Sequence, residues 1–178
     1  MTYYVFIEND KIKGVGQARL LNESVTNLEI PKELFDAYVE EPEKYVWSSE
    51  GIIINPNYEQ ERADKERARI DSLTVTKADF FDATIQAFGL NDAAIEQIIN
   101  QVLSSGDYDD KTKMIAMNHF KNAKDFYRNH ELFKVLSDTE IKVSDTVSIT
   151  ITSTQLDNYF INANKPDTKA TAYLALIT

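Results

Sequence analysis

The feature that most constrains the fold is a charged run over residues 58–71, in the middle of the chain. Acidic and basic side chains are interleaved there at helical spacing, as in Glu61 and Lys65. Each such pair stabilises a helix by about 0.2–0.5 kcal/mol, and the run has no heptad of apolar residues that would favour a coiled coil. We therefore expect a solvated helix at residues 57–72 that connects two modules.

Residues 1–56 have the pattern of a small strand-rich α+β module. YYVFIEND and KIKGVGQARLL predict two strands joined by a turn at Asn9-Asp10, because aromatic and β-branched residues suit strands and Asn-Asp suits a turn. TNLEI predicts a third strand. PKELFDAYVEEPEKY predicts a short helix with Pro31 in its first turn. WSSEGIIINPN predicts a turn and then a strand, and its three consecutive isoleucines indicate a strand covered on both faces or one paired at a partner's edge.

Residues 73–178 predict a mainly helical module with late strands. Thr76 resembles an N-cap and Gly89 a C-cap, and an apolar stripe follows in LNDAAIEQIINQVLSSG. DYDDKTKMIAMNHFKNA and FYRNHELFKVLS predict a third and a short fourth helix, and we expect these helices to pack as a bundle. IKVSDTVSITIT alternates as a β-hairpin would, with a turn at Ser144-Asp145. STQLDNYFINA predicts a helical turn capped by Ser153 or Thr154, and TAYLALIT a terminal strand.

The composition excludes several classes of function. A formal net charge of −10, from 29 acidic and 19 basic side chains, disfavours binding to phosphate backbones and to anionic membranes. The absence of cysteine excludes disulfides and thiolate chemistry. The N-terminus has no signal-peptide pattern, and no apolar stretch is long enough to span a membrane. We expect a soluble, acidic protein made in a cytoplasm.

No motif in the sequence predicts catalysis, a cofactor or a metal. His119 and His130 are eleven residues apart, which would place them roughly 16 Å apart on one continuous helix, too far to share a metal ion. A calcium loop starting at Asp107 would need an acidic residue at its twelfth position, where Asn118 stands. Capping of a helix N-terminus explains the acidic cluster Asp107, Asp109 and Asp110 more simply. Nucleotide and nucleophile-elbow patterns are absent, so we expect no enzyme.

Two apolar segments remain as candidate partner-binding elements, the three-isoleucine strand and the terminal strand. A strand at a chain end could extend a partner's sheet, although pairing with VSITIT inside its own module is the simpler alternative. The aromatic residues Tyr3, Tyr4 and Trp47 could act as anchors. The candidate partner-binding residues are Tyr3, Tyr4, Trp47, Ile52, Ile53, Ile54, Tyr173, Leu174 and Leu176.

Several segments together resemble a family. The opening MTYYVFIENDKIKGVGQARLL, the EGIIINPNYE strand and the KER-rich run into SLTVTKADFF resemble small accessory proteins from the tail modules of phages and prophages of Gram-positive bacteria. The FYR segment Phe126–Arg128 and the STQLDNYF helix resemble the C-terminal part of such proteins. Asn129-His130 replaces an expected glycine, and residues 141–152 look like added strand material. The motifs are loose, and none is catalytic.

This resemblance implies a context more than a mechanism. It suggests a non-enzymatic structural or assembly accessory of a tail or fibre, made in the bacterial host cytoplasm and incorporated in the virion if it is a structural part. The expected partners are phage tail proteins, with homo-oligomerisation left open and no nucleic acid or membrane. The alternative is an acidic decoy that inhibits a nucleic-acid-binding defence protein of the host, as anti-CRISPR proteins do.

Overall fold

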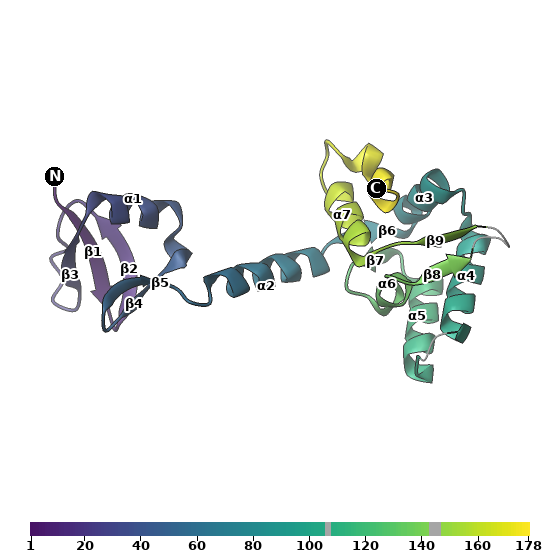
Figure 1. Cartoon of the computed structure of the whole chain (residues 1–178), viewed down its shortest axis with the longest axis horizontal. Coiled ribbons are helices and arrows are strands. Elements are labelled where there is room, and N and C mark those ends of the chain that lie inside the picture. Colours follow the sequence, from purple (N-terminus) through teal and green to yellow (C-terminus); the bar gives the residue numbers. More distant parts are fainter. Residues whose placement is uncertain (106–107, 143–146) are drawn as a thin grey trace. The chain divides into compact units, whose positions relative to one another are not determined.

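The N-terminal unit is built on the predicted hairpin and third strand. Figure 1 shows the computed structural model, which describes residues 1–105, 108–142 and 147–178. Strands β1 (Tyr3–Glu8) and β2 (Lys11–Gly16) pair antiparallel, and Asn9 and Asp10 take φ values of 51° and 56° in the turn. Positive φ at both residues matches the twist of a tight hairpin. Strand β3 (Thr26–Ile30) pairs with the other edge of β1.

A helix and a second hairpin complete this unit. Helix α1 (Lys32–Glu40) follows Pro31, and a 3-10 turn, η1 (Pro42–Lys44), leads into β4 (Tyr45–Ser48) and β5 (Gly51–Ile54). The small core consists of Val5, Ile7 and Ile30, with partly buried apolar residues packed around it. The predicted hairpin, third strand and isoleucine strand are therefore confirmed, whereas the predicted helix ends earlier, at Glu40, and β4 was not predicted.

The charged run forms helix α2 (Tyr58–Asp71), as predicted, and none of its residues is buried. The chain forms one compact unit at residues 1–65 and another at 66–178, so the unit boundary lies within α2. Near its start the Tyr58 hydroxyl donates to Glu41 at 3.1 Å, and Lys65 pairs with Glu43 at 2.6 Å. The ion pair Glu66–Arg69 follows on the same helix. Local charge pairing thus stabilises a helix that has no apolar face.

The first part of the C-terminal unit combines helices with a short two-stranded sheet. Its elements are β6 (Thr74–Thr76), α3 (Lys77–Phe88), α4 (Asp92–Ser105), α5 (Asp110–Asn122), β7 (Asp125–Tyr127) and α6 (Glu131–Leu136). Thr76 caps α3 and Gly89 ends it at φ 72°, as predicted. The FYR segment was predicted to begin a helix and instead belongs to β7, because Phe126 pairs with Val75 of β6 and both are buried. The fourth helix begins only at Glu131.

The second part contains the predicted late hairpin, and it differs from the prediction at the start of α7 and in the terminal segment. Strands β8 (Glu140–Lys142) and β9 (Ser148–Thr150) pair antiparallel, and the predicted turn at Ser144-Asp145 lies outside the described residues. Helix α7 (Ser153–Ala163) is capped by Thr152, one residue earlier than predicted, because Thr152 and Gln155 form a reciprocal capping box. The chain then enters the 3-10 helix η2 (Lys169–Leu176).

The predicted terminal strand TAYLALIT is wrong, because this segment is η2. Its small residues Ala172 and Ala175 lie three positions apart and are buried with Leu176. A 3-10 helix repeats every three residues, which places both alanines on one face, and this face packs on α7 and α3. The partner proposed for the strand is engaged elsewhere, since β9 pairs with β8.

An aromatic cluster forms the centre of the C-terminal core. The Phe80 ring meets those of Phe126 and Phe133 edge-on at centroid distances of 5.6 and 5.2 Å. Tyr159 approaches the same ring at 5.9 Å. Such pairs add about 0.5–1.5 kcal/mol each beyond the burial of apolar area. Within the described ranges, no helix combines the length and apolar character that a membrane crossing requires.

Candidate functional site

The β4–β5 hairpin carries apolar side chains on both of its faces. Trp47 lies opposite Ile52, and both pack against the small N-terminal core. Successive residues of a strand point to opposite faces, so Val46 and its partner Ile53 occupy the other face. Ile53 remains 36% exposed there. The run of isoleucines is therefore not covered on both faces by its own chain.

The edge of β5 away from β4 is open. Among the described residues, β4 is the only strand that pairs with β5. The Asn55 N–H donates to the Lys44 carbonyl at 2.8 Å, which continues the β4–β5 ladder. Because alternate residues of an antiparallel strand bond to the same neighbour, the main-chain groups of Ile52 and Ile54 face the open edge. Ile54 is 60% exposed, so this edge combines free main-chain groups with apolar surface.

The two tyrosines predicted as anchors lie on β1 and have local partners. The Tyr3 ring packs on Phe35 of α1 at a centroid distance of 4.7 Å. The Arg19 guanidinium lies over the Tyr4 ring at 5.3 Å. Both tyrosines are half-buried. The structure thus places them on the first sheet and not on the β4–β5 hairpin with Trp47.

The three predicted residues near the C-terminus lie on η2 in different environments. Leu176 is 1% exposed and belongs to the core, whereas Leu174 is 42% exposed. Tyr173 is half-buried and packs against the core. A strand would have presented Leu174 and Leu176 on one face, and the 3-10 helix separates them.

A cavity of about 380 Å³ lies between α3, α7 and η2. Tyr159 contributes a buried hydroxyl that has no hydrogen-bond partner among the described residues. Burial, and then the nearby carboxylates of Asp79 and Asp82, raise the pKa of the Tyr159 hydroxyl, which therefore stays protonated. The Lys169 ammonium pairs with Asp79 at 3.2 Å. No sequence pattern predicts this cavity, since its polar groups come from three separate elements.

The two histidines lie together, contrary to the sequence-based expectation. His119 is on α5, and His130 precedes α6 and accepts a hydrogen bond from Leu132 N–H through Nδ1. Strand β7 intervenes, and the two rings lie tilted by 34° with centroids 3.0 Å apart beside an open pocket of about 500 Å³. Burial and the neighbouring His130 lower the pKa of His119 to about 4, and burial also lowers the pKa of His130.

The described residues contain no group of three or more His, Cys, Asp or Glu side chains arranged to hold a metal ion. In the acidic cluster, Asp109 accepts the Thr112 N–H at 2.8 Å as the N-cap of α5. Asp110 lies in the first turn of that helix, and Asp107 is outside the described residues. Capping therefore explains the described part of the cluster, as predicted.

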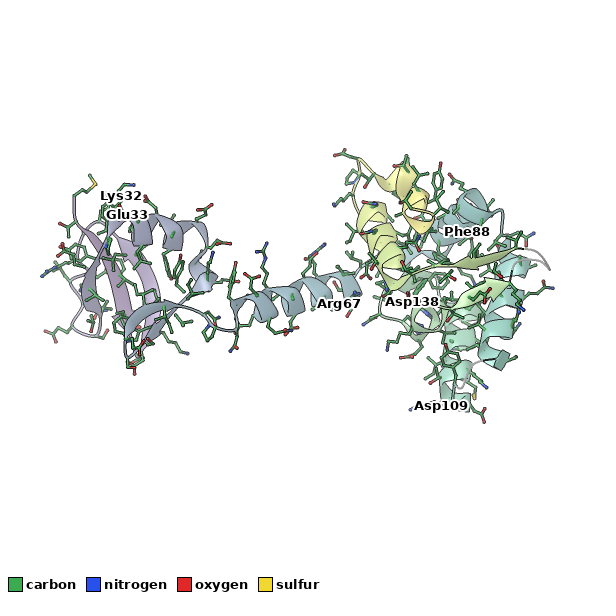
Figure 2. The ribbon with its side chains drawn as sticks, viewed as in Figure 1. Lys32, Glu33, Arg67, Phe88, Asp109 and Asp138 are labelled. Carbon is green, nitrogen blue, oxygen red and sulfur yellow. The ribbon has the colours of Figure 1, made fainter. Side chains whose placement is uncertain are left out.

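A network of ion pairs around the buried Arg128 connects the end of α2 to the C-terminal core. Arg128 is 4% exposed and pairs with Asp157 of α7 at 2.7 Å through Nε. Its Nη2 donates to the Ser153 carbonyl and hydroxyl at 3.0 and 2.8 Å. Arg67 of α2 pairs with the other oxygen of Asp157 at 2.6 Å and also with Asp71. Figure 2 labels Arg67 at the end of α2. Every charged group in this network has a partner of opposite charge, so we assign the network a structural role.

Comparisons of the chain with protein-family models, with curated proteins and with solved structures find no match.

Proposed function

We propose that this chain is a non-enzymatic accessory protein of a phage or prophage tail, which acts in structure or assembly through protein–protein contacts. The observation that carries the proposal is the open edge of β5. Ile53 and Ile54 are exposed there, and the described chain pairs no second strand with it. The tail context itself comes from the family resemblance of the sequence.

The open edge suits an added strand from a partner. The main-chain groups of Ile52 and Ile54 would supply the hydrogen bonds, and the apolar side chains on both faces would supply contact area. Proteins usually protect exposed edges with charges, prolines or bulges, whereas Gly51–Ile54 contains none of these. We infer that β5 is an interface strand whose second neighbour belongs to another molecule.

The alternative, an acidic decoy for a basic cleft, receives less support. A decoy needs carboxylates that are free to meet a partner's cations. In α2 and the segment before it, neighbouring cations already pair with the carboxylates of Glu41, Glu43 and Glu66. These three carboxylates are therefore less available to a partner's cations.

The test compares an edge variant with a matched surface variant. Ile54→Lys adds a charge to the open edge, and Val39→Lys adds the same charge to α1, where Val39 is also exposed. After induction of a host that carries the prophage, we expect tagged wild-type protein and Val39→Lys to recover tail proteins. Ile54→Lys should lose them while it folds as the wild type.

Mass spectrometry of purified particles then distinguishes a structural part from an assembly helper. A structural part would be present at fixed stoichiometry, and its absence would leave the helper. Light scattering adds the oligomeric state, because a dimer that Ile54→Lys dissociates would make a second copy the neighbour of β5. Retention of tail proteins by Ile54→Lys would contradict the proposed interface.

A further inference from the structure

The cavity beside Tyr159 has the construction of a small binding site. It is lined by residues of α3, α7, the segment between α7 and η2, and η2 itself, and it is partly open to solvent. Its walls include the small side chains of Ala83, Ala163 and Ala172 and the ring of Tyr173. A volume of about 380 Å³ lies at the lower end of the usual range of small-molecule sites. The short alanine side chains leave this volume open.

The Tyr159 hydroxyl is the polar group of this cavity that could accept a hydrogen bond from a ligand. Tyr159 is 1% exposed, and its hydroxyl makes no hydrogen bond in the structure. A buried hydroxyl without a partner destabilises a fold, and natural proteins rarely retain one without a reason. Its ring is fixed by edge-on contacts with Phe80 and Phe160. The hydroxyl is thus preorganised beside the cavity and offers a lone pair to a donor that enters it.

The electrostatics of the cavity favour a cation. Asp79 and Asp82 carry two negative charges and Lys169 one positive charge at its lining. Asp79 is engaged by Lys169, whereas Asp82 is exposed and has no ion pair within the described ranges. The negative potential that disfavours ionisation of Tyr159 would stabilise a positive group at the same place. Tyr173 also lines the cavity, and an aromatic side chain favours a cation over a neutral group.

We propose that this cavity binds an ammonium or guanidinium group on a short apolar stem, with Tyr159 Oη accepting a hydrogen bond from the cation and Asp82 pairing with its charge. The stem would lie along the alanine walls. The site is separate from the β5 edge and does not depend on the proposed function. The cationic group could belong to a free amine or to an arginine or lysine side chain of a protein, and the experiment distinguishes these sources.

The test is an NMR titration of the full-length protein with three probes. N-acetylarginine amide represents a protein side chain, 1,4-diaminobutane a free amine, and N-acetylcitrulline amide the neutral isostere of the arginine probe. We expect saturable shifts of residues that line the cavity with at least one cationic probe and none with the citrulline probe. Tighter binding of the arginine probe identifies a protein side chain as the source, and tighter binding of the diamine identifies a free amine.

Three variants place the binding in this cavity. Tyr159→Phe removes only the hydroxyl and should fold with unreduced thermal stability, because it deletes an unpaired buried group. It should lower the affinity for the cationic probe about tenfold, which is the loss expected for one hydrogen bond to a charged group. Asp82→Asn should weaken it by a similar factor, and Glu140→Gln, at an exposed carboxylate outside the lining, should not change it.

Three results would overturn the proposal. One is equal binding of the citrulline and arginine probes. A second is wild-type affinity in both Tyr159→Phe and Asp82→Asn. The third is the absence of shifts with every cationic probe, or shifts only with a neutral sugar such as glucose, which would assign the cavity to a different ligand class.

Discussion

The two units of this chain differ in how completely they bury their apolar residues. The core of the N-terminal unit consists of three buried residues, Val5, Ile7 and Ile30, surrounded by half-buried ones. The C-terminal unit buries aliphatic residues from most of its elements around an aromatic cluster centred on Phe80. A small unit has too much surface for its volume to cover every apolar side chain. The N-terminal unit therefore exposes apolar strand residues, whereas the C-terminal unit holds its unusual polar groups inside.

Because of this difference, the two units can carry different kinds of binding site. An exposed strand edge needs only main-chain groups and a few apolar side chains, which the β4–β5 hairpin supplies. A buried hydroxyl such as that of Tyr159 needs a core large enough to exclude water, which the C-terminal unit provides. We therefore assign surface recognition to the N-terminal unit and cavity chemistry to the C-terminal unit.

The largest expected effect comes from Phe80→Ala in the aromatic cluster. Removal of a buried phenylalanine ring typically costs about 3–5 kcal/mol of unfolding free energy. Trp47 is the single tryptophan and lies in the N-terminal unit, so its fluorescence follows that unit, while far-UV circular dichroism follows mainly the helices of the other. We expect Phe80→Ala to lower the urea midpoint seen by circular dichroism and to leave the fluorescence midpoint unchanged.

Val5→Ala is the matched change in the N-terminal core. Val5 is fully buried, and its truncation should cost about 2 kcal/mol. It should lower the fluorescence midpoint alone. If either variant moved both midpoints equally, the two units would unfold as one, and the contrast between their cores would have no thermodynamic meaning.

The second prediction tests whether burial determines how much each ion pair of Asp157 contributes to the free energy of unfolding. Arg128→Ala leaves Asp157 without its buried partner, and breaking such a pair typically costs about 3–5 kcal/mol. Arg67→Ala removes a more exposed partner of the same carboxylate, and exposed pairs contribute about 1 kcal/mol or less. We expect circular dichroism to show a large loss for Arg128→Ala and a small one for Arg67→Ala. Equal losses would show that burial does not decide their contributions.

Local sequence signals predicted most of the secondary structure. The Asn9-Asp10 turn, the Thr76 cap, the Gly89 terminus and the charge pattern of α2 each depend on neighbouring residues, and the structure contains all of them. The failures occur where distant contacts decide. TAYLALIT has the composition of a strand, yet packing of its alanines on α7 makes it a 3-10 helix.

The polar clusters could not be predicted for the same reason. The spacing of His119 and His130 predicts a large separation only on one continuous helix, and the structure instead brings them together across β7. The unpaired hydroxyl of Tyr159 depends on the exact positions of three elements and has no sequence pattern. The exposed edge at Ile52–Ile54 was predictable in part, since three consecutive isoleucines exceed what one buried face requires.

The smallest effect concerns the histidine pair and pH. Both histidines have a lowered pKa in the folded state, about 4 for His119 against an ordinary value of 6.5. Between these values the unfolded chain binds more protons, so the stability is complete above pH 6.5 and falls as the pH drops towards 4. The half-buried rings remain partly screened by solvent, so the loss should be roughly 1 kcal/mol. Circular dichroism melts between pH 7 and 5 should show it in the C-terminal unit.

His119→Gln provides the control, because glutamine retains a polar side chain and does not titrate. Its stability should decline less than that of the wild type between pH 7 and 5, because only His130, whose pKa burial also lowers, still titrates there. The N-terminal unit contains no histidine, so the Trp47 signal should not change in this range. Its carboxylates Glu8 and Glu41, whose pKa values are lowered, respond only below their ordinary pKa of 4.5. A decline of both signals above pH 5 would show that the histidine pair is not its source.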